Sequence, residues 1–218
     1  FAAMGAGSPP PLAYDLPVLA ADAVAVLDHL GLAQADIIGV SGGATVAGEV
    51  AAAHPDRVGR LVLVMANSGN PARPMPARPE RMAAVPPPPS AGAEVAAVVG
   101  WRTTAWTALG APASPALDAL AREATARSWD PDGTTRAGAA LLTSGDRRAR
   151  LAAVAAPTLV IHGADDPLIS PDAGRDVAEA IPEADFQLIP GMGHDLSPAG
   201  VEAVLAALAS SPEPADGD

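Results

Sequence analysis

The sequence predicts an α/β fold built on a mostly parallel sheet, and two observations lead to that prediction. First, four short apolar segments have the pattern of strands: residues 36–40, 60–65, 158–162 and 185–189. Second, RLVLVM and TLVIH are continuous apolar runs, as expected of parallel strands covered on both faces. Helical patterns lie between and around these segments, and such alternation is typical of an α/β parallel sheet.

The predicted helices begin and end at residues that suit those positions. Asp15 can cap the first helix, whose apolar residues recur at helical spacing until Gly31 ends it. The second covers residues 45–54 and the third 172–181, and each ends before a proline. The last begins at Ser197, which precedes a proline suited to a first helical turn.

This alternation stops between about residues 67 and 150. Residues 70–90 are proline-rich, so we expect no regular element there. Helical patterns follow at about 94–109, 116–129 and 133–143, and all three tryptophans fall in this part of the chain. We expect a mostly helical insertion that lies over one end of the sheet.

A division of the chain follows from these patterns. We expect residues 1–66 and 151–209 to form the two parts of one core, and residues 67–150 to form the helical insertion. The last segment, residues 210–218, is short, polar and proline-containing, so we expect a disordered tail.

Composition excludes several classes of function. The formal net charge is −12 and no basic cluster exceeds DRRAR at residues 146–150, which argues against a nucleic-acid surface. The chain has no cysteine, so disulfides and thiolate-bound metals are excluded. No apolar run reaches the length of a membrane span, and the first residues lack the pattern of a signal peptide. We therefore expect a cytoplasmic protein without a membrane partner.

One serine lies in a motif that can carry chemistry. Residues 39–43, GVSGG, fit G-x-S-x-G with a predicted strand before and a predicted helix after. Glycines at its ends would permit a sharp turn that lifts the Ser41 hydroxyl above the sheet, near a helix N-terminus. The pentapeptide alone fits a nucleophile and a plain structural turn equally well.

Two further loops supply the partners that a serine nucleophile needs. The third strand segment leads into HGADDP, with Asp165 and Asp166, and the fourth leads into GMGHD, with His194. Ligands bind at the carboxyl ends of parallel strands, so the serine, an acid and a base would share one rim. The alternatives are that one or both aspartates cap the turn and that His194 is an ordinary loop residue.

The remaining histidines carry no predicted chemistry. His162 lies at a strand end and is expected to be buried and hydrogen-bonded, while His29 and His54 lie near helix C-termini. Because the four histidines do not cluster at metal-ligand spacings, we predict neither a metal site nor a cofactor.

With these residues placed, the chain resembles a bacterial α/β-hydrolase of the serine esterase type, and is especially similar to actinobacterial hydrolases grouped with aclacinomycin methylesterase. The resemblance runs from about residue 5 to residue 209, and its motifs are AYDLPVLAADAVAVLDHLGL, IIGVSGGATVAGEVAAAHPDRVGRLVLVMANSG, TSGDRRARLAAVAAPTLVIHGADDPLISP and AIPEADFQLIPGMGHDL. It implies Ser41 as nucleophile, Asp166 as the acid before the proline, and His194 as base. It also implies that the insertion is the family's helical cap.

The activity implied by this resemblance is hydrolysis of a carboxylic ester or lactone of a small to medium apolar substrate. The backbone N–H of Gly42 would be one oxyanion donor. A cofactor-free haloperoxidase or perhydrolase and a C–C hydrolase would use the same three residues. A catalytically impaired fragment or a binding protein is the alternative of another class, and the oligomeric state stays open.

The N-terminal segment predicts an incomplete version of that fold. GAGSPPPLAYDL matches the segment just past the family's fourth strand, so the opening strands and the loop with the second oxyanion donor are expected to be absent. MGAG at residues 4–7 is the alternative candidate for that loop. The strand before Ser41 would then be an unpaired edge that favours association.

Overall fold

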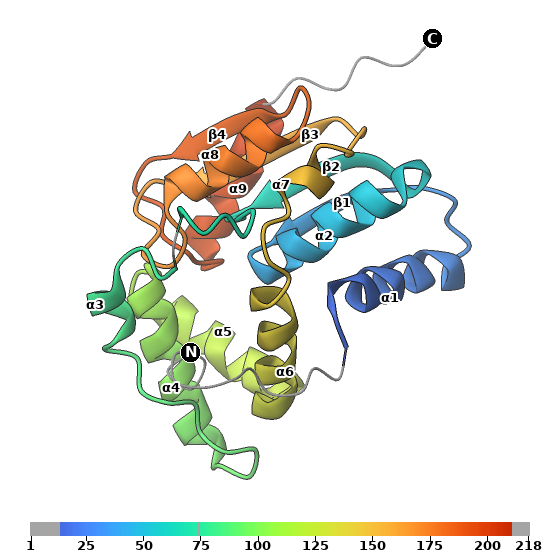
Figure 1. The fold of residues 1–218 in the computed structure, drawn as a ribbon. Coiled ribbons are helices and arrows are strands. Elements are labelled where there is room, and N and C mark those ends of the chain that lie inside the picture. Colours follow the sequence, from blue (N-terminus) through green and yellow to red (C-terminus); the bar gives the residue numbers. More distant parts are fainter. Residues whose placement is uncertain (1–13, 74, 211–218) are drawn as a thin grey trace.

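The computed structural model describes residues 14–73 and 75–210, and its centre is one four-stranded sheet (Figure 1). All neighbouring strands pair in parallel, in the order β1-β2-β3-β4. The strands are β1 (Ala35–Val40), β2 (Val58–Val64), β3 (Thr158–Gly163) and β4 (Asp185–Ile189). The four predicted strands are thus confirmed, with boundaries that shift by at most two residues.

The continuous apolar strands supply two cores, one on each face of the sheet. Leu61 and Leu63 pack with the apolar residues of the helices on one face, and Val62 packs with α9 on the other. The helices that bound these cores are α1 (Leu16–His29), α2 (Gly42–Ala53), α7 (Arg148–Leu151) and α8 (Pro171–Ala180) on the first face and α9 (Pro198–Ser210) on the second. Burial on both faces explains why these strands show no polar alternation.

Helix boundaries follow the local signals closely. The Asp15 side chain accepts a hydrogen bond of 3.1 Å from Val18 N–H, as its predicted capping role requires, and α1 ends before Gly31, which has a φ of 68°. Helix α2 begins at Gly42, three residues earlier than predicted, so Ser41 directly precedes its first turn.

Four further helices gather at one end of the sheet, where Figure 1 shows them in green to yellow. They are α3 (Pro79–Met82), α4 (Val95–Leu109), α5 (Pro115–Arg127) and α6 (Pro131–Leu142). The expectation of no regular element in residues 70–90 is wrong for α3, because its proline occupies the first helical position, where no N–H donor is needed. The division into core and insertion stays a prediction.

Tryptophans anchor the proline-rich segment to these helices. Trp101 donates its indole N–H to Pro86 O at 2.8 Å, and Trp129 donates to Ser90 O at 3.0 Å. The two rings also contact each other, with centroids 5.4 Å apart. The segment is therefore held against α4 and the end of α5, although it contains little regular structure.

Strand β1 forms one edge of the described sheet, as predicted for the strand before Ser41. Its Ile38 side chain is 57% exposed, which is unusual for a central position in an apolar strand. None of the described helices combines the length and apolar character needed to cross a membrane. Residues 4–7, the alternative candidate for the oxyanion loop, lie outside the described residues, as do all but the first residue of the predicted tail.

Candidate active site

Ser41 lies in a strained turn between β1 and α2. Its φ of 54° and ψ of −118° lie in a region that non-glycine residues rarely adopt. A Cβ atom at Gly39 would lie 2.5 Å from Gly43 O and 2.7 Å from the Cβ of Ala47, so only glycine lets the helix pack so close to the strand. By contrast, Gly43 faces open space, so the turn does not require glycine there.

The structure brings the three predicted site residues into one hydrogen-bonded chain. Ser41 Oγ lies 2.8 Å from Nε2 of His194, and Nδ1 of His194 lies 2.7 Å from Oδ2 of Asp166. The carboxylate can only accept, so Nδ1 of His194 carries the proton and Nε2 can accept the one from the serine hydroxyl. This is the geometry in which an imidazole can act as a general base toward Ser41.

The carboxylate that faces His194 belongs to Asp166 and not to its neighbour. Asp166 is 2% exposed, whereas the Asp165 side chain is 59% exposed and lies 3.9 Å from Arg78. Oδ1 of Asp166 also accepts hydrogen bonds of 2.8 Å from the backbone N–H groups of Leu168 and Ile169. Asp166 therefore caps the turn and contacts the histidine, whereas the sequence left open which of the two aspartates would cap the turn.

A second histidine contacts the same carboxylate and was not predicted as part of the site. His162 is fully buried, as expected, and its Nε2 lies 3.3 Å from Oδ2 of Asp166 and 3.0 Å from Ile169 O. Burial acts to raise the pKa of the Asp166 carboxyl, but hydrogen bonds from His162, His194 and the backbone N–H of Ile169 outweigh it and lower the pKa to about 2. Only the four-residue spacing from His162 to Asp166 could have suggested this contact.

The loop that carries His194 is held by the helices at this end of the sheet. His194 N–H donates a hydrogen bond of 2.7 Å to Leu109 O, at the end of α4. The other two histidines lie elsewhere, His29 in the last turn of α1 and His54 at the C-terminal end of α2. The structure thus separates them from the three clustered residues.

The Gly42 N–H lies beside the serine and is free to bind a ligand oxygen. It belongs to the first turn of α2, where N–H groups have no intrahelical partner, and it donates to no other group in the described part of the chain. A Cβ atom at Gly42 would lie 2.6 Å from Cδ1 of Leu141 in α6, so the Leu141 side chain packs directly against the turn.

Two cavities open at Ser41, and their walls differ in chemistry. One, of about 410 Å³, is mostly apolar; it is bounded by His194 and by side chains such as Met65, Trp106 and Leu117. The other, of about 320 Å³, lies on the Gly42 side and has Asn67, Asn70, Arg73 and Arg147 in its wall. A substrate at Ser41 could therefore extend in two directions with different surroundings.

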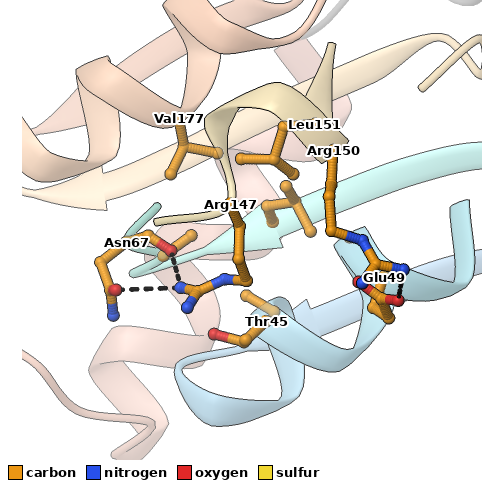
Figure 2. A pocket seen from close by; sticks show the side chains of 11 residues that line it. Thr45, Glu49, Asn67, Arg147, Arg150, Leu151 and Val177 are labelled. Carbon is orange, nitrogen blue, oxygen red and sulfur yellow. Dashed lines mark hydrogen bonds and ion pairs between the residues drawn. The ribbon is translucent and has the colours of Figure 1, made fainter. Parts of the chain in front are cut away.

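A third, much smaller void shares Thr45, Asn67 and Arg147 with the second cavity and is also lined by Arg150 and Leu151 of α7 (Figure 2). Its volume of about 10 Å³ has room for a single water at most. Buried Glu49 pairs there with Arg150, while Arg147 reaches toward Asn67. Within residues 14–73 and 75–210, no three His, Cys, Asp or Glu side chains are grouped to hold a metal ion.

Known proteins share this architecture. A hydrolase from Pseudomonas aeruginosa PA01 is 31% identical; the match covers 94% of this chain and 76% of that one, with a TM-score of 0.66. A proposed non-heme bromoperoxidase, BpoC, from Mycobacterium tuberculosis H37Rv is 26% identical over 91% of this chain and 74% of that one, with a TM-score of 0.65. The proposed carbamate hydrolase RutD of Caulobacter segnis is 42% identical over 55 residues, which are 25% of this chain and only 21% of that relative.

A family model extends this similarity to most of the chain. The model described as "alpha/beta hydrolase fold" matches residues 3–199. Together with the parallel sheet and the strand–turn–helix around Ser41, the match confirms the predicted fold class. The chain belongs to the alpha/beta hydrolase fold family.

Proposed function

We propose that the protein is a serine hydrolase that cleaves a carboxylic ester or lactone of a small to medium substrate. One observation carries the proposal: the hydrogen-bonded chain from Ser41 through His194 to Asp166 begins at the junction of two cavities. A serine hydroxyl needs a base to become a nucleophile, and the base needs a group that orients it. All three are present in one arrangement.

The proposed reaction is acyl transfer to water in two stages. His194 takes the proton of Ser41 as Oγ attacks the carbonyl carbon, and then gives it to the departing alcohol. Water, deprotonated by the same imidazole, attacks the acyl-enzyme, and the acid leaves as the serine recovers its proton. Asp166 stays ionised throughout, holds the imidazole orientation and stabilises the imidazolium.

The negative charge of each tetrahedral intermediate needs a fixed donor. We assign one donor to the Gly42 N–H, which is unoccupied among the described residues and lies at the positive end of α2. We assign no second donor among the described residues. Loss of one such donor costs about 10² to 10³ in turnover, so the rate depends on whether a second donor is present.

Related chemistries and a binding role are the alternatives. Relatives of similar fold include the proposed bromoperoxidase named above and an enol-lactonase from Burkholderia xenovorans LB400, and the latter, at 22% identity, informs on fold alone. Peroxide-dependent activity and C–C cleavage would use the same three residues. A binding protein would keep the fold but would not turn over any ester.

The proposal is tested by measuring hydrolysis of a panel of esters and lactones, together with peroxide-dependent activity in the presence of hydrogen peroxide. We expect ester or lactone hydrolysis that falls at least about a thousandfold in Ser41→Ala and in His194→Ala, because nucleophile and base act as a unit. His54→Ala is the matched control, since His54 lies at the far end of α2, and it should retain full activity. Turnover that survives Ser41→Ala would overturn the proposal, and peroxide-dependent turnover alone would favour the haloperoxidase alternative.

A further inference from the structure

The cavity on the Gly42 side of Ser41 has two arginines in its wall and no acidic side chain among the described residues. Arg73 and Arg147 both contribute to its wall, together with the amides of Asn67 and Asn70. No aspartate or glutamate lines this cavity in the described part of the chain, although the protein as a whole has a formal net charge of −12. Such a local excess of donors and positive charge suits an anionic group.

Arg147 is the more buried of the two cations, with 6% of its surface exposed. Its guanidinium donates to both oxygens of Asn67, at 2.8 and 3.1 Å (Figure 2). It also donates to Ser144 Oγ at 2.6 Å and to Gly145 O at 3.0 Å. The charges of Asp146 and Glu49 act on Arg147, but Asp146 pairs with Arg148 and Glu49 pairs with Arg150. No carboxylate lies within ion-pair distance of Arg147 among the described residues, and burial lowers its pKa below the usual value.

A buried cation without an ion-pair partner is costly, since buried charges are ordinarily paired. The hydrogen bonds of Arg147 come from its two terminal guanidinium nitrogens and supply only neutral oxygen dipoles. An anion in the adjoining cavity would reduce the cost of the buried charge. Arg147 therefore makes the cavity attractive to an anion even where it does not contact that anion directly.

Arg73 is the arginine whose guanidinium N–H groups make no hydrogen bond among the described residues. Its guanidinium lies 3.7 Å from Asp172, an ion pair between side chains that are 43% and 68% exposed, and makes no hydrogen bond with another described residue. The loop before it is anchored, because Ser68 Oγ and Asn70 Nδ2 both donate to Asp176 in α8. Arg73 thus stands on a fixed loop with free donors at the edge of the cavity.

The two cavities also differ in their relation to His194. His194 lines the apolar cavity with Trp106 and Leu117 but not the cationic one, which borders Gly42. In the proposed reaction His194 protonates the departing alcohol, so the alcohol portion belongs on its side. The acyl portion then extends into the cationic cavity.

We propose that the substrate is the monoester of a dicarboxylic acid with an apolar alcohol, its free carboxylate held near Arg73 and Arg147. The inference rests on the proposed hydrolase function and specifies its substrate class. Hydrolysis would break the acyl C–O bond, with water supplying the hydroxyl of the new acid and the proton of the alcohol. The products are a dicarboxylate and a neutral apolar alcohol.

Monobenzyl glutarate and benzyl methyl glutarate form a matched pair for the test, because they share chain and alcohol and differ in the free carboxylate. We expect kcat/KM for benzyl alcohol release to be at least about tenfold higher for the monoester, because a charge-assisted hydrogen bond to its free carboxylate contributes a factor of this size. In Arg73→Gln this ratio should fall by about tenfold. Arg78→Gln, a similarly exposed arginine that does not line the cavity, should leave the ratio unchanged.

The outcomes separate the two proposals. Turnover of both esters at equal kcat/KM, or a ratio unchanged in Arg73→Gln, would overturn the substrate class and leave the hydrolase function intact. If neither ester is cleaved, calorimetry of monobenzyl glutarate with Ser41→Ala tests whether the cavity binds the free carboxylate. Binding that weakens in Ser41→Ala/Arg73→Gln supports the anion site, and no binding overturns it. In either case the panel of esters and lactones decides the hydrolase function separately.

Discussion

Nε2 of His162 lies 3.3 Å from Oδ2 of Asp166, the same oxygen that lies 2.7 Å from Nδ1 of His194. Because Ile169 O can only accept, Nε2 of His162 carries the proton, and its Nδ1 is buried with no partner among the described residues. His162 therefore donates its Nε2–H toward the carboxylate. Two histidines and two backbone N–H groups together hold Asp166 ionised and oriented toward His194.

The Asp166→Asn variant tests the orienting role of this carboxylate. An amide in place of the carboxylate favours the wrong tautomer of His194, so kcat should fall by about 10³ to 10⁴. Asp165→Asn is the matched control on the neighbouring residue, and its exposed side chain predicts little change. Steady-state ester hydrolysis measures both, and equal losses in the two variants would contradict the assignment.

Acid unfolding should report the depressed pKa of Asp166. A carboxyl whose pKa is about 2 in the folded state and 3.8 unfolded stabilises the fold fully above 3.8 and loses that contribution as pH falls through 2. The shift corresponds to about 2 kcal/mol of unfolding free energy. The difference in stability between wild type and Asp166→Asn should therefore narrow by about 2 kcal/mol between pH 6 and pH 2. Urea unfolding at each pH measures it, and a constant difference would refute the linkage.

Gly174 should tolerate no side chain, because α8 packs directly on His162. A Cβ atom at Gly174 would lie 2.2 Å from Nδ1 and 2.8 Å from Cγ of that fully buried ring. Gly174→Ala is expected to destabilise the fold by about 1–3 kcal/mol and to reduce turnover by displacing the ring from Asp166. Gly100→Ala, in a helix position with open space, should instead gain up to about 1 kcal/mol. Thermal unfolding compares the two, and a Gly174→Ala variant as stable as wild type would contradict this packing.

Much of the site could be predicted because the parallel strand topology determines which loops lie close together. Once the strands before Ser41, Asp166 and His194 were recognised, their carboxyl ends had to meet at one rim. The choice between Asp165 and Asp166 could not be made from the residues alone. Adjacent side chains point in different directions, and the turn that directs one inward is set by backbone hydrogen bonds.

The cavities are the part that the sequence could not predict. Their walls combine residues from the end of β1, from the residue that follows β2, from the loop before α3, from α4 to α6 and from the segment before α7. The arrangement of these parts depends on tertiary packing. Arg147 was visible only as part of a basic cluster, and nothing local indicated that it would be buried beside Ser41. For Gly43 the sequence suggested more than the structure shows. The motif suggested that the turn needs glycine there, but a Cβ atom at this position would meet open space.

The central claim, that Ser41 is a nucleophile activated by His194, is tested most directly by covalent labelling with a fluorophosphonate probe. Peptide mapping by mass spectrometry identifies the modified residue. We predict one phosphonylated serine, Ser41, with labelling lost in Ser41→Ala, strongly reduced in His194→Ala and retained in His54→Ala. Labelling spread over other serines, or undiminished in His194→Ala, would contradict the account.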